Sequence, residues 1–347
     1  MQKVSRVTGG IIRHRLMEEA RSLFVPLSID AGDGLVVLLL GPTQSGKSML
    51  FREVVSSLDN AFRDDNPGAI PVIDLQIETV GDGRARPKWL GIELLKSLKH
   101  PVYEHIGAMD EGDYYAPSKG RDEGTIRIAL KEGLRHRSVR RVCLDEVHLL
   151  THTKDPDLRA AILESIKSTC AIDRTLIACG GYEIAYRGLF DSAHFCGRVI
   201  TCDFGSYDVD RKEDVHAWAR ILKTYGEHLK LKSDGLLLDE FEFLMIATNG
   251  VVGLLDKMLW RAAITAKAKN CSIDRGILLS CAPPADEKAA IGKDIQLGRA
   301  ALRSMDVLPK STSADVGERS LPEKVRRPFE RNPNRNAVMD ITLDVDD

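Results

Sequence analysis

The sequence predicts an α/β domain with a parallel sheet, followed by a small helical lid and a mostly disordered C-terminal tail. Up to about residue 207, short apolar runs alternate with segments whose apolar residues recur at helical spacing. A complete glycine-rich loop joins the first apolar run to the helix after it. From about residue 208 only helical spacing remains.

We expect the chain to have four segments. They are an N-terminal helix region at residues 1–30, an α/β core at 31–207, a helical lid at 208–282, and a tail at 283–347 that is disordered or binds a partner. The tail is assigned because periodicity fades after residue 283 and residues 310–336 are polar, basic and proline-bearing.

Strands and helices alternate through the predicted core. The strands are expected at residues 35–40, 70–77, 139–144, 175–178 and 199–204. The helices are expected at residues 11–25, 49–55, 89–98, 122–134, 157–170 and 182–190, the first of them ended by Pro26. This alternation implies a parallel sheet with helices on both faces. In the lid, helices are expected at 211–229, 238–248 and 251–268, with a short fourth one starting near residue 271.

The composition is that of an ordinary globular protein, with 43% hydrophobic and 29% charged residues. A formal net charge of −2 argues against a globally basic nucleic-acid binder, although a few local side chains can still form a basic channel. Seven scattered cysteines without a CxxC pair indicate reduced thiols. Without a signal sequence or a membrane-length apolar run, a cytoplasmic location and no membrane partner are expected.

The glycine-rich loop, GPTQSGKS, predicts binding of a nucleoside triphosphate such as ATP with Mg²⁺. Small residues let successive backbone N–H groups surround a phosphate, and the helix N-terminus adds partial positive charge. Lys47 is expected to reach the β- and γ-phosphates, and Ser48 to offer its hydroxyl to magnesium. The expected nucleotide-binding residues are Gly41, Pro42, Thr43, Gln44, Ser45, Gly46, Lys47, Ser48, Met49 and Asp145.

A second motif, VCLDEVHLL, places two carboxylates at the end of a predicted strand. In a parallel sheet this end lies at the same edge as the glycine-rich loop. We expect Asp145 to hold magnesium, directly or through water, and Glu146 to polarise the attacking water. A solvated acidic turn is the alternative for such a pair taken alone.

Two further groups are usual in such an ATPase, a polar residue on the neighbouring strand and an arginine from a neighbouring subunit. The polar position falls on Cys179, Tyr182 or Glu183. For the arginine, Arg198 precedes the last core strand and is the first candidate for a catalytic role, with Arg187 as the second. Each arginine has an ordinary alternative as a surface or helix-capping cation.

The strings GPTQSGKS, CLDEVHLL, TLIACGGYEI, SAHFCGRVITCDF and ATNGVVGLLDKMLWRAA together resemble the TnsC/TniB family of AAA+ transposition regulators, and more distantly MuB. The resemblance covers about residues 10–280. It implies a homo-oligomer, a ring or helical filament, that assembles on duplex DNA with ATP and recruits a transposase and a target-selector protein. It also implies that slow ATP hydrolysis drives disassembly.

The sequence departs from the AAA+ pattern at the lid. Many AAA+ lids carry an arginine where this chain has Gly253. Lys257, one turn on, is a candidate substitute, but a place on a solvated helix face is the favoured interpretation of this residue. With the doubtful polar position on the neighbouring strand, this departure predicts slow turnover.

Loop cations are the candidates for sequence-independent contact with the DNA backbone. Two clusters are expected, listed as Arg84, Arg86 and Lys88, then Lys119 and Arg121. A third cluster at 135–141 is an alternative that faces a neighbouring subunit, and the tail cations Lys324, Arg326, Arg327, Arg331 and Arg335 suggest a transposase-binding segment or a solubilising tail.

Two other functions fit the same motifs. One is a signalling or chaperone-type ATPase that acts on protein alone, and the other is an initiator or helicase-loader ATPase not linked to transposition. Salt-dependent DNA binding separates the first from the DNA-binding alternatives.

Overall fold

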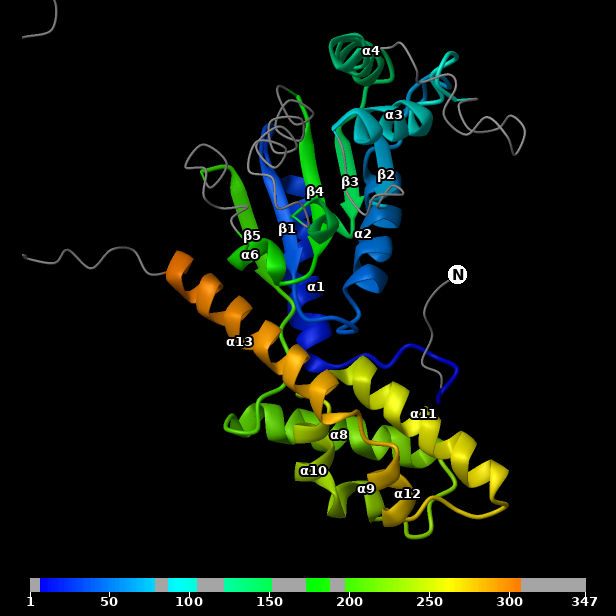
Figure 1. Cartoon of the computed structure of the whole chain (residues 1–347). Helices are drawn as coiled ribbons and strands as arrows, with labels where there is room; N and C mark the ends of the chain where they lie inside the picture. Colours follow the sequence, from blue (N-terminus) through cyan, green and yellow to red (C-terminus); the bar gives the residue numbers. More distant parts are fainter. Residues whose placement is uncertain (1–6, 79–86, 105–121, 152–172, 188–196, 307–347) are drawn as a thin grey trace, which may run out of the picture. The chain divides into compact units, whose positions relative to one another are not determined.

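The computed structural model describes residues 7–78, 87–104, 122–151, 173–187 and 197–306 (Figure 1). The strands are β1 (Val36–Leu40), β2 (Val72–Gln76), β3 (Arg141–Asp145), β4 (Thr175–Gly180) and β5 (Val199–Asp203). The core helices are α1 (Arg15–Asp30), α2 (Lys47–Ala61), α3 (Pro87–Ser97), α4 (Glu123–His136), the 3₁₀ turn η2 (Val147–Thr151) and α6 (Glu183–Tyr186). The later helices are α8 (Lys212–His228), α9 (Leu236–Asp239), α10 (Phe241–Ala247), α11 (Val252–Ala268), α12 (Arg275–Ser280) and α13 (Ala285–Asp306).

The strands form one parallel sheet in the order β2-β3-β4-β1-β5. Strand β1, which lies between β4 and β5, is buried along its whole length, as its run of Val and Leu predicts. Because every pair is parallel, the carboxyl ends of β1, β3 and β4 meet at one edge.

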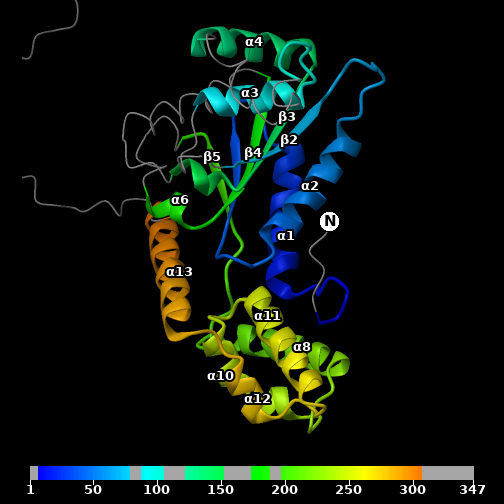
Figure 2. The same cartoon turned by 45° about the vertical axis from the view of Figure 1, so that its right-hand side comes forward.

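Helices cover both faces of the sheet, and alternate residues of β1 point to different clusters. Val37 and Leu39 pack with side chains of α1 and α2, including Phe24, Leu50 and Val54. Val36, Leu38 and Leu40 pack on the opposite face, whose cluster includes Leu90, Leu94, Ile126 and Leu130 from α3 and α4. In Figure 2, α3 and α4 lie above the strands, and α1 and α2 lie to their right. This arrangement confirms the predicted parallel α/β core.

Helices α8 to α12 form the predicted lid around a cluster of their own. Trp218, Leu222, Met258 and Leu259 are at most 1% exposed and lie at the centre of this cluster. Asp274 caps α12, because its Oδ1 accepts a hydrogen bond from Ile277 N at 2.9 Å.

Helix α1 continues through Pro26, so the prediction that this proline ends the helix was wrong. Proline removes one backbone donor, at a cost of about 3 kcal/mol in a helix interior. Burial of Phe24 and Ser28 on either side opposes this cost, and Ala31 N closes the helix on Leu27 O.

The tail does not begin at residue 283 as predicted, because Ala285–Asp306 form helix α13. Its sequence is rich in alanine and charged residues, which favour helix but give a weak apolar stripe. Ile295 is nonetheless 5% exposed and belongs to the sheet cluster. Residues 307–347, and the helix predicted at 157–170, lie outside the described residues.

Candidate functional site

The glycine-rich loop lies between β1 and α2 in a tightly specified backbone conformation. Gly46 has φ +105°, a left-handed value that side chains rarely adopt, and α2 begins at the next residue. A Cβ at Gly41 would overlap the backbone carbonyl of Phe204, which follows β5. The loop is therefore held against the neighbouring strand, with the N-terminus of α2 opening toward it.

Ser45 supplies an independent sign that the loop receives a polar group. Its side chain is 6% exposed, and its Oγ has no hydrogen-bond partner among the described residues. Buried hydroxyl groups are normally paired, because an unsatisfied one costs roughly 1–3 kcal/mol. A phosphate oxygen bound in the loop would satisfy it.

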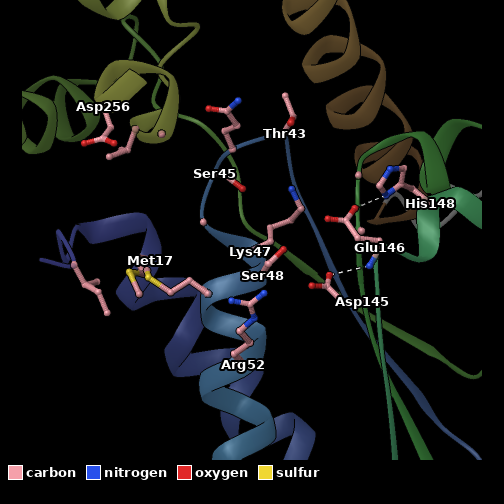
Figure 3. A pocket seen from close by; sticks show the side chains of 18 of the residues that line it. Met17, Thr43, Ser45, Lys47, Ser48, Arg52, Asp145, Glu146, His148 and Asp256 are labelled. Carbon is pink, nitrogen blue, oxygen red and sulfur yellow. Dashed lines mark hydrogen bonds and ion pairs between the residues drawn. The ribbon is translucent and has the colours of Figure 1, made fainter. Parts of the chain in front are cut away.

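Lys47 occupies the centre of this region (Figure 3). Its Nζ donates to Pro42 O at 2.5 Å. Burial lowers the pKa of Lys47, while the nearby Cys179, Glu146 and Asp145 act in the opposite direction. The ammonium group thus lies near ionisable side chains of β3 and β4 at the carboxyl edge of the sheet.

Asp145 and Glu146 come from the end of β3, as predicted. Asp145 is 8% exposed, and its Oδ1 accepts a hydrogen bond from Glu146 N at 2.8 Å. Glu146 has φ +58°, so the chain turns sharply after Asp145. Its Oε2 lies 3.1 Å from Nδ1 of His148, and Figure 3 shows this pair beside Lys47. The His148 ring therefore lies within ion-pairing distance of the Glu146 carboxylate.

A pocket of about 640 Å³ extends from these residues. Its phosphate-loop end contains Lys47, Ser48, Asp145 and Glu146, with Arg52 of α2 beside them. Pockets for small molecules have volumes of roughly 300–1,000 Å³. The pocket is therefore large enough for a nucleotide.

The other end of the pocket is less polar and combines the N-terminal segment with the lid. Ile11, Ile12 and Met17 line it together with Val252 of α11. In Figure 3, Met17 and Asp256 lie on the side of Lys47 away from Glu146. Asp256 accepts a hydrogen bond from Tyr225 Oη at 3.1 Å. This end offers an apolar surface that suits a nucleobase.

His14 connects this end of the pocket to the segment between β5 and the first lid helix, α8. Its Nδ1 lies 3.0 Å from Tyr207 Oη, and its ring packs beside Phe204. Burial, with a smaller effect from Arg15, lowers the pKa of His14 to about 4. The imidazole is therefore neutral at neutral pH and shares a hydrogen bond with the tyrosine hydroxyl.

The lid meets the phosphate loop through its backbone. A Cβ at Gly253 would overlap the carbonyl oxygen of Gln44, so no side chain fits there. The suggested substitute, Lys257, forms an ion pair of 2.8 Å with Glu287 of α13. The lid residues that line the pocket are Tyr225, Val252, Gly253 and Asp256.

The three candidates for the polar position after β4 occupy different places. The Cys179 thiol is buried, and burial together with Asp145 raises its pKa well above the usual value. Tyr182 is fully buried and donates to Asp203 Oδ1 at 2.6 Å, whereas Glu183 lines the pocket. The charges of Asp145 and Lys47 both act on the buried Cys179 thiol.

Arg198 lies at the far edge of the sheet from its own pocket. Its carbonyl accepts a hydrogen bond from Val36 N, at the start of β1, and its side chain is exposed. The length of β1 separates it from the loop by about 13 Å or more. Arg198 therefore lies at the opposite end of β1 from the phosphate loop of its own subunit. Arg187 follows α6 and ends that helix.

Most predicted DNA-contacting residues lie outside the described part of the chain. These are Arg84, Arg86, Lys119 and Arg121. Lys88 lies in the first turn of α3. Hydrogen bonds from the backbone and the side chain of Thr125 lower the pKa of Asp122, and the charge of Lys88 adds a smaller effect in the same direction. The cluster at 135–141 is partly structural, because Arg141 donates to Ser28 O, Ile29 O and Ala31 O.

Several site residues were missed by sequence reasoning. His148 carried a signal, since it follows Glu146 by two positions in a turn. Gln76 at the end of β2 also lines the pocket, and its strand-end position was a usable signal. Asp256 and Asp294 carried none, because only the packing of α11 and α13 brings them to the pocket.

The ligand set fits magnesium. Ser48 and Asp145 both line the phosphate-loop end, and Mg²⁺ is usually held by one or two protein oxygens together with substrate phosphates and water. Among the described residues, no group of three or more His, Cys, Asp and Glu side chains has the arrangement of a metal site. Ser48 and Asp145 would therefore hold the ion only together with a nucleotide.

The sheet order, the loop after β1, the Asp-Glu pair after β3 and the helical lid define the fold of an AAA+ P-loop ATPase. No protein-family model matches the sequence, and a search of curated proteins found no match.

A search of solved structures found similar chains at low sequence identity. ORC1 of Aeropyrum pernix in complex with DNA is 17% identical with a TM-score of 0.49, over 78% of this chain and 65% of that one. ORC2 of the same organism, in ADPNP-ADP complexes, is 12% identical with a TM-score of 0.48, over 76% of this chain and 66% of that one. The Walker-type ATPase PABY2304 of Pyrococcus abyssi is 15% identical with a TM-score of 0.48, over 88% and 79% of the two chains. The chain spans just under two thirds of the length of the two ORC proteins.

In the part of the chain that the structure describes, no single helix has the length and hydropathy needed to cross a membrane. Helices α10 and α11 pass that test only as a pair, bent by 112°.

Proposed function

We propose that this chain is an ATPase that binds Mg-ATP in the pocket described above. The observation that supports this most directly is the phosphate loop itself, with Gly46 at φ +105° and the unpaired, buried Ser45 Oγ at the N-terminus of α2. Its position beside Asp145 and Glu146 adds the two carboxylates that hydrolysis requires.

Each residue then has a definite task. Lys47 leaves the Pro42 carbonyl and contacts the β- and γ-phosphates. Ser48 and Asp145 would hold magnesium, which would supply positive charge to screen the phosphates. Glu146 orients the attacking water and accepts its proton. His148 holds Glu146 in that orientation from 3.1 Å.

ATP hydrolysis by the purified chain tests this proposal. We expect slow, magnesium-dependent phosphate release that Lys47→Ala abolishes, with Arg63→Ala as a control cation outside the pocket lining. Lys47→Ala hydrolysing ATP at the wild-type rate would show that the loop is not the site.

We further propose that ATP-bound subunits assemble on duplex DNA, where Arg198 of one subunit completes the pocket of the next. Arg198 is exposed and cannot reach its own pocket, which supports a role between subunits. The motif resemblance to the TnsC/TniB regulators supports the finer proposal that the assembly marks a target for a transposase and that hydrolysis ends it.

An initiator or helicase-loader role, or a signalling role on protein alone, is the competing proposal. Measuring the affinity for a fluorescently labelled DNA duplex at salt concentrations between 50 and 200 mM distinguishes the signalling role from the DNA-binding roles. Binding through the phosphate backbone weakens steeply, by about 10³-fold or more for six or more contacts, whereas a protein-directed ATPase shows no measurable DNA binding.

A further inference from the structure

Helix α13 is attached to both the lid and the core. On the lid side, Asn249 Nδ2 donates to Lys288 O at 3.0 Å, and Lys257 pairs with Glu287. On the core side, Tyr186 Oη donates to Asp294 Oδ1 at 2.8 Å, and Arg299 donates to Ser206 O at 2.6 Å. Figure 2 shows α13 running from the last lid helix to α6.

The core contacts of α13 are close-packed. A Cβ at Gly298 would overlap the ring of Tyr182, so the helix backbone lies directly on that side chain. Tyr182 in turn donates to Asp203 at the end of β5. Together with buried Ile295, these contacts hold α13 against the carboxyl edge of the sheet.

This seating places Asp294 in the phosphate-loop end of the pocket. Asp294 lines the pocket with Lys47, Asp145 and Glu146, and its charge acts on Lys47. Glu183 of α6 lines the same end. Four carboxylates thus line the pocket together with the lysine, and the charges of Asp145, Glu146 and Asp294 act on it.

We propose that α13 is an autoinhibitory strap whose Asp294 opposes the γ-phosphate and so weakens the binding of ATP relative to ADP. The proposal rests on the proposed function of the pocket as an ATP site. An added γ-phosphate brings negative charge next to a fixed carboxylate, and like charges in a partly enclosed site repel strongly. ADP lacks that group and is affected less.

The position of Asp294 near Lys47 also means that α13 would move when ATP binds. For ATP to bind well, Asp294 must move away from Lys47, and the Tyr186 hydrogen bond is its direct anchor on α6. Movement of Asp294 is passed to the lid, because Glu287 and Lys288 on the same helix hold Lys257 and Asn249. ATP binding is therefore coupled to a shift of α13 on the core.

Isothermal titration of the full chain with Mg-AMPPNP and with Mg-ADP tests the strap. Asp294→Asn removes the charge but keeps an oxygen that accepts from Tyr186, so the fold is preserved. We expect it to tighten AMPPNP binding about tenfold and ADP binding by less than about twofold. The matched control is Asp286→Asn, an exposed carboxylate in the first turn of α13, with both affinities unchanged.

The outcomes are distinguishable. If the wild type binds both nucleotides and Asp294→Asn leaves the ratio of the two affinities unchanged, the strap proposal is wrong while the ATP site stands. If Asp286→Asn shifts the ratio as much as Asp294→Asn, the effect belongs to the net charge of the helix and the proposal is also wrong. If no variant binds either nucleotide, the proposed function fails and the strap fails with it.

Discussion

Glu146 has a conformation that few residues with a side chain adopt. Its φ of +58° costs on the order of 1 kcal/mol, and the hydrogen bond to Asp145 and the contact with His148 maintain it. The strained turn directs the carboxylate toward Lys47 instead of continuing the strand (Figure 3). Such strain at a strand end is typical of functional sites.

We expect Glu146→Gln to bind Mg-ATP with nearly wild-type affinity and to lose at least about 100-fold in hydrolysis rate. The amide keeps the size of the side chain but cannot accept the proton of water. Calorimetry and phosphate release measure the two effects separately. Loss of ATP binding in this variant would assign Glu146 to nucleotide binding instead.

The pKa of His14 predicts a dependence of stability on pH. The unfolded chain takes up a proton at His14 below about pH 6.5, and the folded chain only near pH 4, so the stabilisation present above pH 6.5 is lost as the pH falls toward 4. Raised pKa values of Asp203 and Asp294 act in the opposite sense, so a comparison of variants is needed.

Between pH 7 and pH 5 we expect wild type to lose about 1–2 kcal/mol more unfolding free energy than His14→Phe. Urea titrations at the two pH values measure this difference. Equal pH dependence of the two proteins would mean that His14 titrates normally in the fold.

At the scale of elements, the strands and most helices were predictable because their patterns are local. The apolar run of β1 and the stripe of α8 are complete within their own sequences. Helix α13 was missed because its seating depends on contacts with Tyr182 and Tyr186, far away in the chain. The continuation of α1 through Pro26 was missed because burial outweighed a local breaker.

The contact between α11 and the phosphate loop predicts that Gly253→Ala is destabilising. The new methyl group would displace the Gln44 carbonyl, so we expect a loss of about 1–3 kcal/mol and weaker nucleotide binding. Gly226→Ala in α8 is the matched control, because its Cβ would lie 3.8 Å from Leu231 Cδ1. That control is expected to be neutral or to stabilise by up to about 1 kcal/mol, and thermal unfolding compares the two.

A stable Gly253→Ala protein with normal nucleotide affinity would mean that the lid does not rest on the loop in solution. The sequence showed that the usual arginine is missing at this position. It could not show the reason, which is the approach of two backbones from different segments.

At the scale of the whole molecule, the candidate site was predictable in its phosphate-binding half. Lys47, Ser48, Asp145 and Glu146 meet at one sheet edge because the order of parallel strands requires it. The positions of Ile11, Met17, Asp256 and Asp294 in the pocket lining were not predictable, since they depend on how the N-terminal segment, the lid and α13 pack. The roles proposed for these residues remain predictions.

The proposed assembly requires outward-facing contact residues, and Arg198 is the described residue to which we assign such a contact. The central claim is that ATP in the pocket joins subunits on DNA. The most direct measurement is sedimentation velocity of the full chain with a 60-base-pair duplex, in Mg-AMPPNP and in Mg-ADP. We predict fast-sedimenting protein–DNA complexes in AMPPNP only, and none with Arg198→Ala. Identical sedimentation of the wild type in the two nucleotides would contradict the account.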